Sequence, residues 1–186
     1  MPGNFKKEDL RIEKTLKAIQ EALCKILGCH SFRRVTVNGL CEEAQISRTT
    51  FYTHFKDKYD LLEFCLANIS EKIKRNIDDC SDYIRIEKII NQLILENKQV
   101  ISNVVKNAND ETMDLLYASM LSLLNIADKK GDDEQLSPQD IILSNFFAGG
   151  MMKFLLWQVE NKFPQDFQLI NPHFFSMVVH ILKWKE

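Results

Sequence analysis

Hydrogen-bond donors and basic side chains gather in one stretch of the sequence, residues 47–58. Arg48, Lys56 and Lys58 outnumber the one acid there, Asp57. Donors without charge stand between them, among them Ser47, Thr49, Thr50, Tyr52 and His54. A mixture of cationic and neutral donors suits the phosphate oxygens of a nucleic-acid backbone. The stretch therefore predicts a surface that binds a duplex.

Two short helices are predicted to present this surface. Thr36 is a good N-cap for the first helix, which would bury the apolar side chains of Val37, Leu40 and Ala44. Ser47 is an equally good N-cap for the second helix. Because only a short turn joins them, the two helices form a helix-turn-helix, and the second helix is its exposed member.

Spacing within the second helix separates an inner face from an outer one. Phe51 and Phe55 are four residues apart, so both would face the core of a small domain. Arg48, Thr49 and Tyr52 would then point toward solvent. The outer face is thus polar and cationic.

Longer helices flank this unit. Residues 10–27 carry apolar side chains at intervals of three and four, which predicts an amphipathic helix that ends at Gly28. Its apolar positions are Leu10, Ile12, Leu16, Ile19, Leu23, Ile26 and Leu27. Asp57 is the expected cap of a helix of about six turns, whose apolar stripe runs from Leu61 to Ile77.

The rest of the chain also predicts helices. Apolar periodicity indicates helical segments at 83–96, 100–105, 111–127, 139–160 and 172–184. Residues 128–138 lack periodicity, so we expect a loop there, with Ser137 and Pro138 starting the next helix. Gly 6 and Pro 4 among 186 residues are too few for a loop-rich fold. We predict an all-α protein, with a three-helix N-terminal domain over residues 1–62 and a helical C-terminal domain over residues 63–186.

The segment 139–160 is apolar nearly all round, so it should be covered on more than one side. Gly149 and Gly150 would cost about 1 kcal/mol each in a helix interior, and such a pair suggests that another helix or a ligand approaches the backbone. The aromatic side chains of this segment fit a dimer interface better than a ligand site. The candidate lining of a ligand pocket is Tyr117, Phe147, Met151, Phe154 and Trp157.

Net charge gives no global sign of nucleic-acid binding, because it is −2 with a pI near 6.1. Its distribution along the chain is more informative. Residues 1–66 hold 11 basic and 9 acidic side chains, whereas residues 67–186 hold 13 and 17. A mildly basic N-terminal domain is therefore joined to an acidic C-terminal one.

The run from Thr36 to Leu62 resembles the DNA-binding signature of the TetR family of bacterial transcriptional regulators. The most specific part is Thr49-Thr50-Phe51-Tyr52-x-His54-Phe55-x-x-Lys58-x-x-Leu61. A weaker resemblance covers residues 9–80, and residues 146–157 resemble a C-terminal domain common in members from Firmicutes. The resemblance implies a homodimer whose recognition helices enter successive major grooves of a pseudo-palindromic DNA operator, about 34–36 Å apart.

The same resemblance implies a role for each residue of the recognition helix, residues 47–54. Arg48 and Thr49 would read base edges in the major groove. Tyr52 and His54 would contact phosphates, and Lys58 with the start of its helix would hold a further phosphate. The complete implied DNA-binding set is Thr36, Ser47, Arg48, Thr49, Thr50, Tyr52, His54 and Lys58.

Two residues depart from regular geometry in this unit. The family's turn usually has glycine where this chain has Gln45. A residue other than glycine that is forced to positive φ there costs roughly 1–2 kcal/mol. Gly39 softens the helix that precedes the turn. Both residues loosen the unit but leave its recognition face intact.

Other classes of function find little support. The sequence has no phosphate-binding glycine loop, zinc-protease motif or nucleophilic serine elbow, so we expect neither an enzyme nor a cofactor. His173 and His180 share a helical face, but no carboxylate or cysteine completes a metal site, and the five cysteines form no Cys-x-x-Cys pair. Without a signal peptide or an apolar stretch of about 18 residues, we expect a soluble cytoplasmic protein without membrane contact.

One main hypothesis and two alternatives follow. The main hypothesis is an effector-responsive repressor, in which a small apolar effector widens the separation of the two recognition helices through the helix that Asp57 begins. The first alternative is an activator controlled by a regulatory protein, which predicts a C-terminal domain without an enclosed cavity. The second is an all-α interaction module without DNA binding.

Overall fold

The computed structural model describes residues 5–78, 92–125 and 138–164. Within these ranges the regular elements are helical and no strand occurs, which confirms the all-α prediction. The elements are α1 (Phe5–Leu27), the 3-10 helix η1 (Phe32–Arg34), α2 (Val37–Ala44), α3 (Arg48–His54), α4 (Lys58–Asp78), α6 (Lys98–Val105), α7 (Asp110–Asn125) and α8 (Pro138–Glu160).

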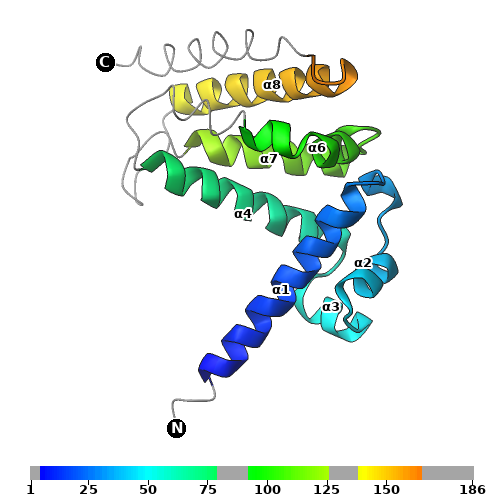
Figure 1. Ribbon diagram of the computed structural model, residues 1–186. Helices are drawn as coiled ribbons and strands as arrows, with labels where there is room; N and C mark the ends of the chain where they lie inside the picture. The colour runs from blue at the N-terminus through cyan, green and yellow to red at the C-terminus, as the bar shows by residue number, and fades with distance from the viewer. Residues whose placement is uncertain (1–4, 79–91, 126–137, 165–186) are drawn as a thin grey trace.

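The helices form two parts joined by α4 (Figure 1). α1 packs along α2, and α2 along α3, at one end of the molecule. α4 starts next to this recognition unit, α1 to α3, and runs out beneath α7, which in turn carries α8 on its other side. α6 contacts both parts, because it packs against α1 and η1 as well as against α7 and α8. The domain boundary that we place after residue 62 therefore falls inside a helix that belongs to both.

The three predicted helix caps are all present. The Oγ1 of Thr36 accepts the N–H of Gly39 at 3.1 Å at the start of α2. The Oγ of Ser47 accepts a backbone N–H in the same way at the start of α3, at 3.0 Å. Asp57 Oδ1 accepts two N–H groups of the first turn of α4, at 2.8 and 3.0 Å. Each cap satisfies backbone donors that have no partner inside the helix, so the sequence sets all three starting points.

The turn between α2 and α3 has the strained residue that we predict. Gln45 has φ 54° and ψ 45°, in the left-handed region. Its N–H donates to the carbonyl of Glu42 at 3.3 Å, and the N–H of Ile46 donates to the carbonyl of Cys41 at 3.0 Å. This bonding pattern is a Schellman motif, which normally has glycine at the left-handed position. The turn thus keeps its geometry at a cost in backbone strain.

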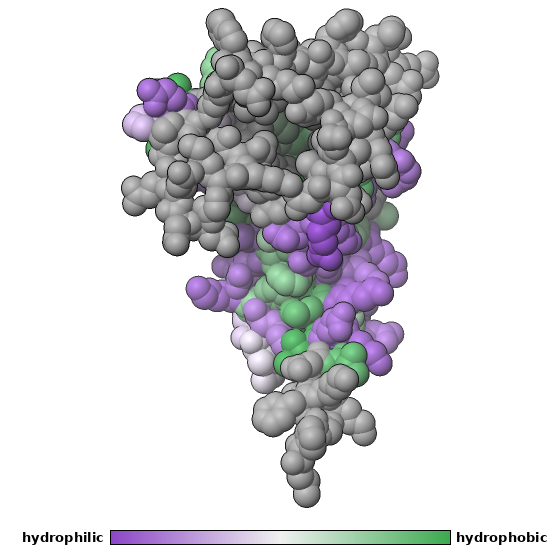
Figure 2. Space-filling view, turned by 90° about the vertical axis from the view of Figure 1, so that its left-hand side faces the viewer, coloured by the Kyte–Doolittle hydropathy of each residue, from purple (hydrophilic) through white to green (hydrophobic). Residues whose placement is uncertain are grey.

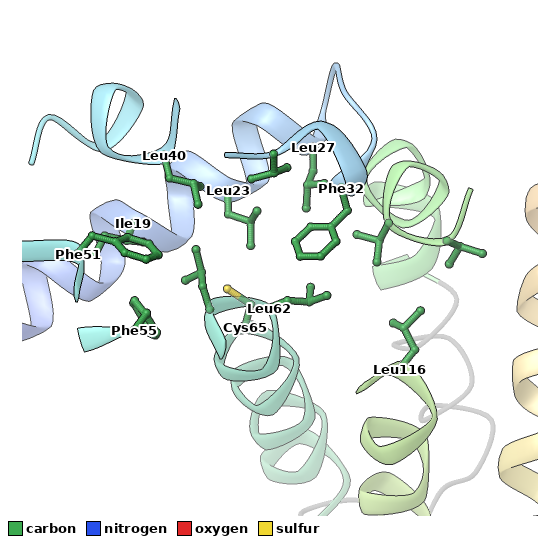
Figure 3. Close-up of a cluster of buried hydrophobic side chains, with 14 of the residues drawn as sticks. Ile19, Leu23, Leu27, Phe32, Leu40, Phe51, Phe55, Leu62, Cys65 and Leu116 are labelled. Atoms are coloured by element: carbon green, nitrogen blue, oxygen red, sulfur yellow. The ribbon is translucent and has the colours of Figure 1, made fainter. Parts of the chain in front are cut away.

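The core of the recognition unit is closed and continues into the second part of the molecule, the body, which α6, α7 and α8 form (Figure 3). Phe51 and Phe55 point inward from α3, as predicted, with ring centroids 5.7 Å apart. Figure 3 shows side chains of α1, η1, α3 and α4 converging on one interior. The fully buried ones include Ile19, Leu23, Leu40, Phe51 and Leu61. The same cluster extends to Val104, Val105, Leu116 and Met152, so α6, α7 and α8 share it.

The first turns of α1 differ from the prediction. The helix begins at Phe5 rather than near residue 10, and Leu10 and Ile12 are 53% and 42% exposed. These turns extend past the rest of the recognition unit (Figure 1), so their apolar side chains are not enclosed. Figure 2 shows a narrow hydrophobic band between hydrophilic residues on this face of the lower part of the molecule.

The α8 helix begins at the expected proline, but its burial differs from the prediction. Ala148 and Met152 are buried, whereas Ile142 is 70% exposed. No atom lies within 4 Å of where a Cβ would stand at Gly149 or Gly150. No described element approaches this pair, so the expectation that a helix or a ligand does so stays a prediction. Among the described residues, α8 buries one face on its neighbours and leaves the other exposed.

Several predicted features lie outside the described residues. They are most of the helix at 83–96, the loop at 128–137, the segment 172–184, and the pair His173 and His180. Residues 92–96, at the end of the first of these, are helical. None of the described helices combines the length and hydrophobicity that crossing a bilayer requires.

Candidate nucleic-acid interface

Arg48 is the first residue of α3, and its guanidinium is held from two sides. Its Nη1 donates to Asn38 Oδ1 on α2 at 2.7 Å. Its Nη2 lies 3.4 Å from the hydroxyl oxygen of Tyr52, one turn along α3, and its Cζ lies 5.8 Å from the centroid of the Tyr52 ring. Both side chains are exposed. The outer face of α3 thus carries an oriented positive charge.

Ser47 and Thr50 form a hydroxyl pair at the start of the same helix. Their oxygens are 2.8 Å apart, and Ser47 Oγ also accepts the N–H of Thr50 at 3.0 Å. One hydroxyl proton is used within the pair, because two hydroxyls share a single hydrogen bond. The other remains available to an acceptor such as a phosphate oxygen. The pair therefore serves first as a cap and second as a donor.

The other predicted contacts on α3 divide by exposure. Thr49 is exposed, and Tyr52 is 49% exposed despite packing edge-on against Phe51. His54 is half-buried in the last turn, with its ring 6.4 Å from that of Phe55. The outer face of α3 thus presents Arg48, Thr49 and Tyr52 to solvent, as predicted from the spacing.

Thr36 starts α2 and is exposed. Its Oγ1 accepts the N–H of Gly39, which leaves its hydroxyl proton free to donate outward. The adjacent helix α2 also carries Asn38, so this helix contributes polar groups next to α3.

Lys58 occupies a different environment from the other predicted contacts. Its Nζ donates to the carbonyls of Phe32, Arg33 and Val35 at 3.1, 3.3 and 3.1 Å. The ammonium lies 4.9 Å from the ring centroid of Phe32 and 5.4 Å from that of Tyr59. Burial lowers the pKa of Lys58, and the acids Glu111 and Asp57 oppose this shift. The three donors of this ammonium thus hold η1 against α4.

The first turn of α4 is also occupied by side chains of the chain itself. Asp57 accepts the N–H groups of Tyr59 and Asp60, and Asp60 accepts the N–H of Lys56 at 2.8 Å. Two carboxylates therefore stand where the resemblance implied a phosphate. Because like charges repel, we leave Lys58 and the start of α4 out of the contact set that we propose below.

Sequence reasoning missed three asparagines that join elements. Asn38 accepts from Arg48, as described above. Asn103 on α6 donates to the carbonyl of Leu27 at 2.7 Å, so it caps the end of α1, and Asn109 donates to the hydroxyl of Tyr59 at 3.0 Å. The partners lie 10, 76 and 50 residues apart in the chain. No local pattern could have paired them.

The candidate pocket residues are distributed over α7 and α8. The hydroxyl of Tyr117 donates to Asn145 Oδ1 at 2.9 Å and so ties the two helices together. Phe154 and Trp157 stack with centroids 6.1 Å apart, and Met151 is half-buried. The side chain of Phe147 lies outside the described part of the structure. A pocket formed by these five residues stays a prediction.

No cluster of histidine, cysteine, aspartate or glutamate able to hold a metal ion occurs among the described residues.

Comparison with known proteins finds a family model that matches the recognition unit. Residues 19–65 match the family model described as "Bacterial regulatory proteins, tetR family". This part of the chain is therefore similar to the DNA-binding region of TetR-family regulators. The match covers α3 whole and runs from the middle of α1 into α4, so it contains the cap residues and the outer face described above. TetR-family proteins are regulators and not enzymes, which confirms that prediction.

Individual proteins of similar sequence or fold also bear the names of transcriptional regulators. The chain is 26% identical over 103 residues to an uncharacterized HTH-type transcriptional regulator, YxbF, of Bacillus subtilis (strain 168). That match covers 53% of this chain but only 25% of the relative's length. A TetR transcriptional regulator from Streptococcus agalactiae is 19% identical with a TM-score of 0.64, over 94% of this chain and 99% of that one.

A further solved structure shares the fold. It is the transcriptional regulator FadR from Bacillus subtilis in complex with stearoyl-CoA, at 14% identity and a TM-score of 0.56. The similarity covers 88% of this chain and 97% of that one. The recognition unit and the helical body together therefore follow an architecture known from TetR-family regulators.

Proposed function

We propose that the protein is a transcriptional repressor that binds a pseudo-palindromic DNA operator as a homodimer. The observation that carries this proposal is the outer face of α3, where an oriented arginine stands beside exposed hydroxyl groups on a rigid, buried base. Such a face supplies hydroxyl donors for phosphates and a fork-shaped donor, the guanidinium of Arg48, for base edges. A repressor of this kind would act in the cytoplasm, where bacterial DNA lies.

The proposed contacts are those that are exposed or half-buried and able to donate. Arg48 and Thr49 read base edges in the major groove, because they stand at the start of the recognition helix. Tyr52, His54 and the hydroxyl of Thr36 bind phosphates. The Ser47 and Thr50 pair gives one further donor to the backbone.

The outer face of α8 supports the homodimer. Ile141 and Ile142 are exposed on it, and no described residue fills the space beside Gly149 and Gly150. A glycine pair lets a second helix come close to the backbone, so we propose that the same face of a second copy covers it. In the Ile142→Glu variant, light scattering should then give the mass of a monomer. The Lys17→Glu variant, at an exposed position on α1 away from this face, should remain a dimer, and equal masses for the two variants would contradict this interface.

A small apolar effector is the finer part of the proposal. Tyr117 on α7 and Met151 on α8 are half-buried, and Phe154 and Trp157 stack on α8. The related regulator FadR was solved with stearoyl-CoA, which supports an apolar ligand in a body of this fold. An effector that prefers a different spacing of the two α3 helices would lower the affinity for DNA through α4.

Selection from random duplexes tests the proposal. The full chain is mixed with a pool of duplexes about 30 base pairs long, enough for two half-sites one helical turn apart. We expect repeated capture to enrich one sequence with two-fold symmetry, referred to below as the enriched duplex. A captured pool without any shared sequence would contradict sequence-specific regulation.

A further inference from the structure

Asn38 makes the shorter of the two hydrogen bonds to Arg48, the proposed base-reading arginine. It lies on α2, ten residues before Arg48, and the two side chains meet across the turn at 2.7 Å. The bond also fixes which end of the amide faces Arg48. Because a guanidinium only donates, the carbonyl oxygen of Asn38 must point toward it, and the amide nitrogen must point away.

We propose that Asn38 is a positioning residue for Arg48 and thereby sets how well the protein distinguishes one DNA sequence from another. This inference rests on the proposed function, because it assigns Arg48 to DNA. Asn38 acts through Arg48 and needs no DNA contact of its own.

The geometry explains why Arg48 needs a second hydrogen bond to be held in one orientation. A guanidinium is a flat fork with five N–H donors on a flexible stem. Tyr52 alone would hold it at a single long contact of 3.4 Å and by its ring. Asn38 adds a short bond from the neighbouring helix, so two separate elements fix the plane of the fork. Three N–H donors then remain for DNA.

A guanidinium that is already oriented loses less conformational entropy when it binds DNA. The gain applies only where a base presents acceptors in the matching direction, as guanine does with O6 and N7. A phosphate accepts from many directions, so binding to backbone alone gains little. Loss of Asn38 should therefore reduce discrimination between sequences more than it reduces general affinity.

Asn38 is also a residue whose removal spares the fold. It is exposed, and the cap of α2 is made by Thr36 and Gly39. Its Oδ1 accepts a hydrogen bond from Arg48, whose side chain is also exposed. The Asn38→Ala variant should thus unfold at the temperature of the parent protein.

A double-mutant cycle on the full chain tests the inference. Affinities are measured for the enriched duplex and for a scrambled duplex of the same composition, with Asn38→Ala, Arg48→Ala and the double variant. We expect Asn38→Ala to lower the ratio of the two affinities about tenfold, with the salt dependence unchanged. In the double variant it should add nothing to Arg48→Ala. The matched control, Glu42→Ala on the exposed side of α2, should keep the parent ratio.

Two results would overturn the inference. One is a parent-like ratio in Asn38→Ala, and the other is full additivity with Arg48→Ala, which would show an independent role. The Asn38→Asp variant, which keeps an acceptor oxygen, should retain the ratio while binding both duplexes more weakly, because its charge repels phosphate. Loss of the ratio in that variant also contradicts the inference. Equal binding of both duplexes by the parent protein would instead contradict the proposed function. That outcome is distinct from the results above, which are changes in the affinity ratio of a variant relative to the parent protein.

Discussion

Large apolar side chains have opposite surroundings in the recognition unit and on α8. Ile19, Phe51 and Leu61 are fully enclosed, whereas Ile142 on α8 is 70% exposed. Both segments are rich in apolar residues, but only the side chains of the first lie in a closed core, to which α4, α6, α7 and α8 contribute. The difference shows that the recognition unit is held by side chains from both parts of the molecule. The helix that carries Ile142 has a face that the described residues leave exposed.

The largest expected effect contrasts two isoleucines. Ile19→Ala should lower the free energy of unfolding by about 2–5 kcal/mol, because it leaves a cavity in a closed core. Ile142→Ala should change it by less than about 0.5 kcal/mol in the monomer, because that side chain already contacts water. Urea unfolding at low protein concentration measures both values. Similar losses for the two variants would show that the outer face of α8 is covered within the chain.

The next effect separates Lys58 from the DNA-binding surface. Lys58→Met removes three hydrogen bonds between α4 and the carbonyls around η1, so it should cost about 2–3 kcal/mol of stability. Lys56→Met, at an exposed site two residues earlier, should cost almost nothing. Thermal unfolding without DNA is the measurement. A stable Lys58→Met variant with weakened binding to the enriched duplex would restore Lys58 to the contact set.

A third prediction concerns pH and the buried start of α4. Burial raises the pKa of the Cys65 thiol to about 12 from an ordinary value of 9.0, with a smaller contribution from Cys24. The folded protein keeps this proton in a pH range where the unfolded chain loses it. The ionisation of Cys65 should therefore leave the free energy of unfolding unchanged below pH 9 and lower it by up to about 1.4 kcal/mol per pH unit above pH 9.

The Cys65→Ala variant isolates this contribution, because lysines and tyrosines titrate equally in both proteins. Unfolding by urea at pH 8 and at pH 10 should show a smaller loss of stability in the variant, by roughly 1 kcal/mol. An identical loss in the two proteins would mean that Cys65 is not buried as described.

The smallest expected effect on stability compares two residues with a left-handed backbone conformation, Gln45 and Asn107. Gln45→Gly should stabilise the protein by about 1 kcal/mol, because glycine adopts φ 54° without strain. Asn107→Gly in the body, at φ 62°, should gain much less, because asparagine tolerates this region better. Melting temperatures check the pair. A destabilised Gln45→Gly variant would show that the glutamine side chain contributes a contact that outweighs its strain.

Local physics made the recognition unit predictable from sequence. Thr36, Ser47 and Asp57 are caps whose partners lie two or three residues away, so residue type and position suffice. Phe51 and Phe55 follow from helical spacing. Each of these features depends only on neighbours along the chain.

Contacts between distant residues were not predictable in this way. The donors of Lys58 find carbonyls 23 to 26 residues away and so brace η1, a role that the sequence did not predict. The oxygen of Asn38 finds Arg48 across a turn. The burial of α8 depends on what packs against it, so its apolar sequence indicated a helix but not which face would be covered.

The central claim is that the outer face of α3 binds DNA with sequence specificity. The most direct test is the affinity of the full chain for the enriched and the scrambled duplex over a series of salt concentrations. We predict affinities that fall steeply with salt for both duplexes, and at least about a thousandfold preference for the enriched one at physiological salt. Equal affinities for the two duplexes, or affinities that do not change with salt, would contradict the account.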